Sequence, residues 1–317
     1  MILPTNRRCG LQEGLTCRSS ANDLNIAIVC VIYEQSDAEV EHFVSNLNSL
    51  SGGPYALWLV VTNSERTLST TYSSTFIVHL PENVGWTGGA NEGARRAQAA
   101  GYQNIMFMNT DVRLIAADLV TKLLAALRSE PSVGLVSPGI VSSVGEDRIW
   151  YRGATLSTKT WITRHPGITG PYRPTHRVVL TQVPNGCCLV VRRQVLDQVG
   201  GFDPELFAYF DEADLAHRAA SAGWQSAFVD SPLLAHDHHG RELGAVAAYY
   251  FGRNPLILAK KHLRAWRQAV VVLAQLGAAP YYLFRSQGMT GKTAYVRGVS
   301  HGLAHLLGRT HTGRGHR

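Results

Sequence analysis

The chain of 317 residues contains 45% hydrophobic and 17% charged residues, a composition that supplies a sizeable core and excludes a disordered chain. Its net charge of +7 is unevenly spread, because the last acidic residue is Glu242 and residues 243–317 contain eleven Lys or Arg. A basic segment of this kind can meet an anionic membrane, an acidic partner or nucleic acid. Because no module of interleaved aromatic and basic residues is visible, we expect no nucleic-acid partner.

Cysteine usage and the N-terminus bear on the compartment. The five cysteines form no CxxC pair and have no regular spacing. Cys30 and the pair Cys187 and Cys188 lie within apolar runs, which predicts buried thiols in a reducing compartment. No apolar stretch follows Arg7 and Arg8, so we expect no secretory signal.

Taken in chain order, the sequence begins with a polar, aperiodic stretch at residues 1–24, which we interpret as a tail. Short apolar runs rich in β-branched residues then alternate with segments of helical periodicity. The runs predict strands at 25–33, 55–63, 75–83, 104–109 and 133–141, and the periodic segments predict helices at 37–50, 89–101 and 116–131. This alternation predicts an α/β fold with a mostly parallel sheet covered by helices on both faces.

Polar residues follow three of the predicted strands. Asn63, Asn83 and Asp111 each stand where an apolar run ends, and the last lies in the segment FMNTDVRL. Ligands of such sheets bind at the carboxyl ends of the strands, so these side chains are candidates for a ligand site. The alternative is an ordinary turn, since Asn and Asp favour turns.

A glycine-rich stretch, ENVGWTGGANEGARRA at residues 82–97, lies between a predicted strand and a predicted helix. Its glycines at 85, 88, 89 and 93 allow positive φ and a close approach of the backbone to a ligand, and the following helix N-terminus favours phosphate. The spacing does not match G-x-G-x-x-G, so a purely structural role is an equal alternative.

A cluster of acids follows the aromatic run FAYF. Asp211, Glu212 and Asp214 stand at the start of a predicted helix, where acids complement the helix dipole. One acid would suffice as a cap. Three carboxylates behind an aromatic run indicate partial burial, which can tune a carboxylate into a general base.

Three histidines, His236, His238 and His239, follow this region. In an extended segment His236 and His238 share one face, and imidazoles near carboxylates are candidate ligands of a divalent metal. The alternative is a loop with surface histidines.

Six of these motifs occur in the order of a known family. The segments IAIVCVIYE, VVTNSE, ENVGWTGGANEG, FMNTDVRL and GGFDPELFAYFDEADLAHR, followed by the histidines, resemble the inverting glycosyltransferases of family 2, which have the GT-A fold, and in particular the rhamnosyltransferase-like branch. The resemblance covers roughly residues 25–260. It implies a GT-A catalytic domain at 25–245 and leaves residues 246–317 as a basic helical extension.

The resemblance also implies the reaction. A nucleotide-diphosphate sugar, dTDP-, UDP- or GDP-linked, would donate its sugar with inversion to a hydroxyl of a glycan or lipid-linked acceptor, in the synthesis of cell-surface polysaccharide or glycolipid. A divalent ion, Mg²⁺ or Mn²⁺, would bridge the donor diphosphate. Two alternatives remain: a non-catalytic module that binds nucleotide sugars or glycans, and a nucleotidyltransferase, although the first loop at 33–41 is acidic rather than glycine-rich and basic.

Residue roles follow from the same resemblance. Asp111 matches the metal-binding acid, with His238 or its rival His236 as a further ligand, and Glu212 or Asp211 matches the general base. The implied donor side consists of Tyr33, Asn63, Gly85, Trp86, Gly88, Asn91, Asn109 and Asp111, and the implied acceptor side of Gly186, Asp214 and Arg218. Thr62 stands where an Asp that reads the nucleobase is expected.

The basic C-terminal third mixes cations with long apolar segments. No uncharged apolar run is long enough to predict a membrane span, and the nearest candidate, residues 268–284, is short and interrupted. We instead expect helices over 249–284 to lie on the anionic surface of the cytoplasmic membrane face, as a peripheral protein. The apolar residues expected there are Leu256, Leu258, Leu263 and Trp266, among the cations Arg253, Lys260, Lys261, Arg264 and Arg267. The alternative is that these helices pack on the catalytic domain.

Overall fold

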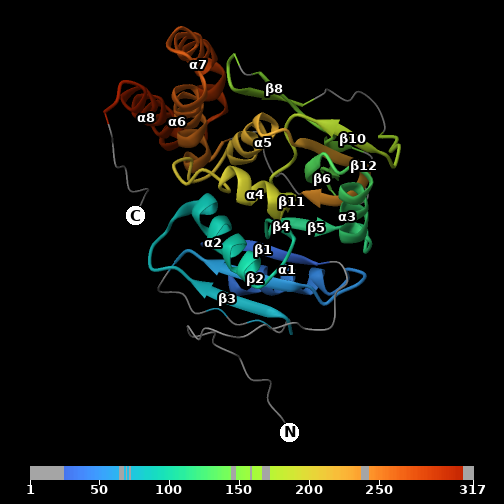
Figure 1. Cartoon of the computed structure of the whole chain (residues 1–317). Helices are drawn as coiled ribbons and strands as arrows, with labels where there is room; N and C mark the ends of the chain where they lie inside the picture. Colours follow the sequence, from blue (N-terminus) through green and yellow to red (C-terminus); the bar gives the residue numbers. More distant parts are fainter. Residues whose placement is uncertain are drawn as a thin grey trace.

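A computed structural model describes most of the chain. The described residues are 25–63, 68, 70, 73–143, 148–157, 159–165, 172–236 and 243–309. They form a ten-stranded mixed sheet flanked by helices, a separate two-stranded sheet, and three C-terminal helices that stand beside the sheet (Figure 1). The predicted N-terminal tail at 1–24 lies outside the described residues.

The first half of the chain alternates strands and helices as the hydrophobic pattern predicts. Its elements are β1 (Ile26–Ile32), α1 (Asp37–Leu47), β2 (Ala56–Val61), β3 (Thr75–His79), α2 (Gly85–Ala99), β4 (Asn104–Met108), β5 (Val112–Leu114), α3 (Leu119–Ser129) and β6 (Val133–Val141). β1, β2 and β6 are almost entirely buried, as expected for strands covered on both faces.

The second half adds both parallel and antiparallel strands to the sheet. Its elements are β7 (Ile149–Tyr151), β8 (Thr155–Ser157), β9 (Ile162–Arg164), β10 (Val178–Thr181), β11 (Cys188–Arg192), α4 (Arg193–Val199), α5 (Asp211–Ser221), β12 (Gln225–His236), α6 (Ala245–His262), α7 (Ala265–Arg285) and α8 (Gly288–Leu306). The main strand order is β10-β12-β6-β11-β4-β1-β2-β3. β11 is antiparallel to both of its neighbours, so β6 and β12 again run parallel to β4.

Successive residues of the strands face two different helical layers, because side chains alternate across a strand. Ile28 of β1 packs in a core cluster with α1 and α3, whereas Val29 packs in a second cluster with α2, α4 and α5. The sheet is therefore the central layer of three, which confirms the predicted α/β class with helices on both faces.

All four glycines of this stretch lie inside α2. The helix therefore begins earlier than the predicted start at residue 89, and no glycine-rich loop precedes it. α2 begins at Gly85. A Cβ atom at Gly89 would lie 2.8 Å from Val31 Cγ1, and one at Gly93 would lie 2.4 Å from Val29 Cγ1. These two glycines therefore let α2 pack closely on β1. For this part of the motif the structure supports the structural role that we gave as the alternative to ligand binding.

Of the four apolar residues expected at a membrane, the C-terminal helices expose only Trp266 strongly. Leu256 and Leu258 are fully buried and Leu263 packs against the same cluster, so the membrane expectation was wrong for these residues; Trp266 is 64% exposed. In the described part of the chain no helix has both the length and the hydropathy to cross a membrane.

Candidate active site

The strand order creates a switch point beside β1. The chain passes from β1 outward to β2 and β3 and then returns to β4 on the opposite side of β1. A crevice opens at the carboxyl ends of strands where the order reverses in this way. Tyr33 follows β1, and Asn109 and Asp111 follow β4, so the tertiary structure brings these predicted residues to one edge.

Strand register brings together Asp111 and His236, two of the residues expected to bind a metal. β12 runs parallel to β6 and ends at this same edge, and its last residue, His236, pairs with Val112 of β5. The adjacent Asp111 then lies with its Oδ2 atom 3.2 Å from Nε2 of His236. Trp150 stacks on the His236 ring with centroids 4.7 Å apart and an interplanar angle of 13°, which orients the imidazole.

These two side chains fit a divalent ion. Carboxylate oxygen and imidazole nitrogen both bind Mn²⁺, and Mg²⁺ uses one or two carboxylates together with substrate phosphates. Within the described residues no group of three or more His, Cys, Asp or Glu could hold a metal. A divalent ion at Asp111 and His236 would therefore need further ligands from elsewhere, such as donor phosphates. His238, the other predicted metal ligand, lies outside the described residues.

The start of α2 lies at the same edge and contacts the end of β4. Gly85 has φ +72° and donates its N–H to Oδ1 of Asn83 at 2.9 Å. The indole Nε1 of Trp86 donates to Oδ1 of Asn109 at 3.2 Å. This bond ties the glycine-rich start of α2 to the end of β4, so two predicted donor-side segments are in direct contact.

The predicted acceptor side adjoins β4 through β11. The N–H of Asn109 donates to the carbonyl of Cys187 at 2.9 Å. A Cβ atom at Gly186 would lie only 3.5 Å from Cβ of Glu212, so Gly186 separates the strand edge from the carboxylate. The pKa of the Cys187 thiol is raised first by burial, then by Cys188 and by the nearby charges of Asp111 and Glu212.

Asp211 and Glu212 are not helix caps. The N-cap position of α5 is Phe210, and no side-chain cap hydrogen bond forms there. Asp211 is 6% exposed, and burial together with the neighbouring charge of Glu212 raises the pKa of its carboxyl well above the usual range. Burial also raises the pKa of Glu212. The fold therefore holds both acids in a desolvated site, an environment that shifts the pKa of a carboxyl toward neutral pH.

The loop that delivers these acids is strained. Phe207, Tyr209 and Phe210 all have positive φ, between 64° and 67°, a conformation that costs on the order of 1–3 kcal/mol for each such residue. Phe207 accepts a hydrogen bond from the N–H of Thr87 at 3.1 Å, so the strained loop adjoins the start of α2. Strain of this kind persists only where surrounding contacts impose it.

Two predicted acceptor-side residues form a buried clamp. Asp214 is fully buried and accepts from Arg218 and from His262 Nε2, both at 2.7 Å. Arg218 also donates to the carbonyls of Val199 and Gly201 at 2.6 Å. The structure therefore places Asp214 and Arg218 where they join the end of α4 to α6.

The remaining predicted donor-side residues differ in what they contact. Asn91 donates to the carbonyl of Phe202 and accepts from its N–H, at 2.8 and 2.9 Å. Its amide therefore positions the turn that Gly200 and Gly201 form after α4. A Cβ atom at Gly88 would lie 2.7 Å from the Val84 side chain. Thr62 is buried and donates to the carbonyl of Ile32, while Asn63 follows β2 at the sheet edge.

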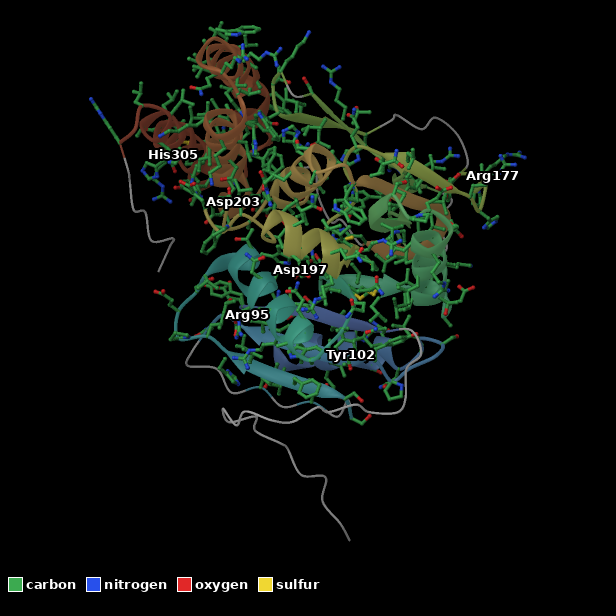
Figure 2. All side chains as sticks on the ribbon, viewed as in Figure 1. Arg95, Tyr102, Arg177, Asp197, Asp203 and His305 are labelled. Carbon is green, nitrogen blue, oxygen red and sulfur yellow. The ribbon has the colours of Figure 1, made fainter. Side chains whose placement is uncertain are left out.

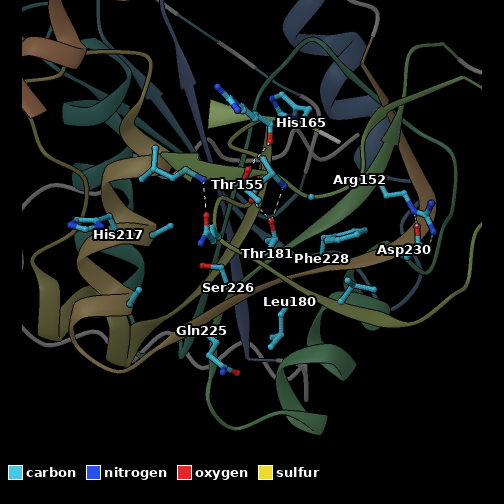
Figure 3. Close-up of a pocket in the computed structure, with 18 of the residues that line it drawn as sticks. Arg152, Thr155, His165, Leu180, Thr181, His217, Gln225, Ser226, Phe228 and Asp230 are labelled. Carbon is cyan, nitrogen blue, oxygen red and sulfur yellow. Dashed lines mark hydrogen bonds and ion pairs between the residues drawn. The ribbon is translucent and has the colours of Figure 1, made fainter. Parts of the chain in front are cut away.

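A separate open cavity of about 1120 Å³ lies along the later turns of α5 (Figure 3). Its lining includes His217 from α5, Phe228 and Asp230 from β12, and Arg152. Arg152 donates two hydrogen bonds to Asp230, both at 2.8 Å. None of the predicted site residues lines this cavity. They gather at the sheet edge described above, which is therefore the candidate active site.

Sequence comparison agrees with this geometry. A family model described as glycosyltransferase like family 2 matches residues 72–264, which is more than half of the chain. The chain belongs to this family. The matched region contains the glycine-rich start of α2, the Asp111–His236 pair and the two acids of α5. The family expected from the six motifs is therefore confirmed.

Several known proteins are similar to this chain in sequence. An N-acetylglucosaminyl-diphospho-decaprenol L-rhamnosyltransferase of Mycobacterium tuberculosis is 40% identical over 86 residues, which are 26% of this chain and 28% of the relative. The alignment thus spans less than a third of that relative. An uncharacterized protein of the same species is 27% identical over 210 residues, 62% of this chain and 72% of the relative. A low-salt glycan biosynthesis hexosyltransferase of Haloferax volcanii is 19% identical over 211 residues, 64% of each.

A solved structure confirms the fold class of the family member. The crystal structure of GalNAc-T7 with UDP, GalNAc and Mn²⁺ has a TM-score of 0.53 at 13% identity, covering 67% of this chain and 43% of the other. At this identity the likeness concerns the fold, and it supports the expected GT-A architecture.

Proposed function

We propose that this family 2 member transfers a sugar from a nucleotide-diphosphate donor to an acceptor hydroxyl with inversion at the anomeric carbon. The observation that carries the proposal is the placement of two acidic groups on one sheet edge. Asp111 and His236 form a pair at the end of β4, and Glu212 lies beside Gly186, with its Cβ 3.5 Å from the position of a Cβ atom there. Gly186 precedes Cys187, whose carbonyl accepts from the N–H of Asn109 at 2.9 Å, so both acids adjoin the same end of β4.

The proposed chemistry divides between the two groups. Asp111 and His236 would hold a divalent ion, which stabilises the negative charge that develops on the leaving diphosphate. The Glu212 carboxylate, or Asp211 if the roles are exchanged, removes the proton from the acceptor hydroxyl. The acceptor oxygen then forms a bond to the anomeric carbon as the bond to the diphosphate oxygen breaks. Attack opposite the leaving group inverts that carbon.

We infer that the acceptor is lipid-linked and that the sugar is a hexose or rhamnose. The support comes from the names of two relatives, one of which acts on a decaprenol diphosphate and the other of which is a hexosyltransferase. A role in cell-surface polysaccharide or glycolipid synthesis follows from the same class of acceptor.

We infer that the protein binds the anionic face of the cytoplasmic membrane through α7. Trp266, Val270, Leu273 and Phe284 are 64%, 39%, 68% and 87% exposed. Their helical spacing places them on one side of α7, opposite the buried residues Val271 and Gln275, and that outward apolar side has the pattern of a helix lying in a membrane interface.

Cations flank this surface of α7. Arg267 lies over the Trp266 ring and Arg285 over the Tyr281 ring, at 5.0 and 5.6 Å from the ring centroids. After Glu242 the chain carries no acid. Arginines at the edge of an inserted apolar strip would contribute about 1 kcal/mol each at an anionic surface.

A donor screen tests the proposed reaction. dTDP-, UDP- and GDP-sugars are each added with Mn²⁺ or Mg²⁺, and thermal stability, donor hydrolysis and transfer to prenyl-diphosphate sugars are measured. One donor should stabilise the protein in the presence of metal, by about 2.7 kcal/mol at 100 times its Kd, and should be turned over. Donor binding without turnover by any acceptor or by water would instead support the non-catalytic module.

A further inference from the structure

One side of α6 contacts the strained loop that leads into the catalytic acids. Tyr250, Arg253, Asn254, Ile257 and Lys261 recur with the three- and four-residue spacing of a helix face. Figure 1 shows α6 beside α4 and α5, on the side of the molecule away from β3. In Figure 2 the labelled Asp203, where the loop begins, lies near this helical group.

The residues at the two ends of this face hold the start and the aromatic part of the loop. Lys261 forms ion pairs with Asp203 and with Glu205, the latter at 2.6 Å. The Tyr250 ring stacks on Phe207, with centroids 5.6 Å apart and an interplanar angle of 11°.

Asn254 lies at the centre of this contact. It is fully buried, and the two N–H hydrogens of its side-chain amide are shared among three carbonyls of the loop. The acceptors are Leu206 at 3.1 Å, Ala208 at 2.8 Å and Tyr209 at 2.9 Å. The positive φ values of the loop direct these carbonyl oxygens toward the same place. A hydrogen-bond donor is favoured there, because it can satisfy the carbonyls.

The carbonyl oxygen of the same amide is left without a hydrogen bond. The Oδ1 atom of Asn254 is buried with no hydrogen-bond partner among the described residues. An unsatisfied buried acceptor is costly, so the stabilising polar contacts of this side chain are the ones that its N–H group donates to the loop.

We propose that Asn254 is a positioning residue that holds the loop 206–210 in its strained conformation and thereby aims Glu212 and Asp211 at the acceptor hydroxyl. The inference rests on the proposed function for its catalytic consequence, whereas the structural hold is independent of it. Loop 206–210 contacts α2 through Phe207 and Thr87, but it does not carry the Asp111–His236 pair. Loss of the hold should therefore reduce turnover without reducing donor binding.

The test compares two conservative changes in the C-terminal helices. Asn254→Leu keeps the branched shape and the number of side-chain heavy atoms and removes the donors. Tyr295→Phe removes a buried hydroxyl that donates to Gln275 Oε1 at 3.2 Å, between α8 and α7. The second change is the control for a lost buried hydrogen bond that does not involve the loop.

Three measurements separate a positioning role from a structural one. Hydrogen exchange of the amides at 206–212 should quicken at least about tenfold in Asn254→Leu and stay unchanged in Tyr295→Phe. Turnover should fall about 10- to 100-fold in Asn254→Leu, as expected for a misplaced catalytic group, with metal-dependent donor affinity within about twofold of wild type. The acidic limb of its pH–rate profile should also shift, because the burial of both acids changes.

The outcomes are distinguishable. Asn254→Ser, which retains a hydroxyl donor, should recover part of both the protection and the turnover. Unchanged exchange of the loop in Asn254→Leu would overturn the proposal, and so would an equal loss of turnover in Tyr295→Phe. If the loop loosens in Asn254→Leu while Glu212→Gln and Asp211→Asn both remain fully active, the proposed function fails and the structural hold stands.

Discussion

Nε2 of His236 lies 3.2 Å from Oδ2 of Asp111, which joins the last residue of β12 to the turn between β4 and β5. Neither residue is near the other in sequence. The antiparallel pairing of β5 with β12 brings them together, and this places an imidazole and a carboxylate where a donor diphosphate would lie.

Asp111→Asn should abolish metal-dependent binding of the nucleoside diphosphate, and His236→Ala should weaken it. The Asp111 side chain is 61% exposed, so the first variant should unfold at the wild-type temperature. Calorimetric titration with UDP, GDP and dTDP, with and without Mn²⁺, is the measurement. Asp118→Asn, an equally conservative change at a half-exposed acid paired with Lys122, is the control. Wild-type affinity in Asp111→Asn would show that the metal site is elsewhere.

Glu212→Gln should lower turnover by roughly 10²-fold or more, the usual loss when a general base is removed, while donor affinity changes little. Steady-state transfer assays with both substrates measure this loss. Because burial raises the pKa of Glu212, the acidic limb of the wild-type profile should lie above the range of a solvent-exposed carboxylate, with activity lost as pH falls through it. If Asp211→Asn shows the larger loss instead, the two acids exchange roles.

Asp230→Asn should reduce stability at neutral pH but not in strong acid. The pKa of Asp230 is lowered to about 2, against the opposing effect of its burial, by hydrogen bonds from Arg152, Thr175 and Tyr172. A depressed carboxyl pKa stabilises the fold above the unfolded value near 4 and loses that effect as pH falls toward 2. The shift corresponds to roughly 2 kcal/mol. Urea unfolding of both proteins should show a difference that is constant above about pH 5 and shrinks below about pH 4; a difference independent of pH would contradict it.

Gly85→Ala should destabilise the protein more than Gly101→Ala does. Both glycines have positive φ, +72° and +96°, so alanine costs about 1 kcal/mol or more at each. A Cβ atom at Gly85 would also lie 2.5 Å from Cγ and from the carbonyl oxygen of Phe207, whereas one at Gly101 meets nothing within 4 Å. Urea denaturation gives the two free energies of unfolding. Equal losses would mean that Phe207 moves away from the new Cβ atom without lowering the free energy of unfolding.

Replacing Leu273 and Phe284 of α7 by serine should reduce binding to phosphatidylglycerol vesicles. These side chains are 68% and 87% exposed, so their removal should leave the fold stable while it removes apolar area that would enter the interface. Co-sedimentation at low and high salt is the measurement, and wild-type binding should weaken with salt. Leu180→Ser, at a 56% exposed leucine of β10, is the control. If wild type remains in the supernatant with both neutral and anionic vesicles at low salt, α7 is not a membrane contact.

The sequence by itself determined the layered α/β fold and the family. Continuous apolar runs predicted β1, β2 and β6 because strands buried on both faces have no polar side. The end of the apolar run that forms β4 made Asp111 a candidate, because a short polar segment after such a run marks the carboxyl edge of a strand. Asp211 and Glu212 became candidates for a different reason, since three acids behind an aromatic run indicate partial burial. These signals are local, so they can be read without knowledge of the tertiary structure.

The tertiary structure decided which residues meet. Periodicity in the sequence could not reveal that β11 is antiparallel within the sheet, nor that β5 pairs with β12 and so brings His236 to Asp111. It could not distinguish the buried Leu256 and Leu258 of α6 from the exposed apolar side of α7, because both helices are apolar and basic. Asn254 carries no sequence signal at all: an asparagine within a helix becomes a loop anchor only when three carbonyls, turned inward by a strained backbone, are packed against it.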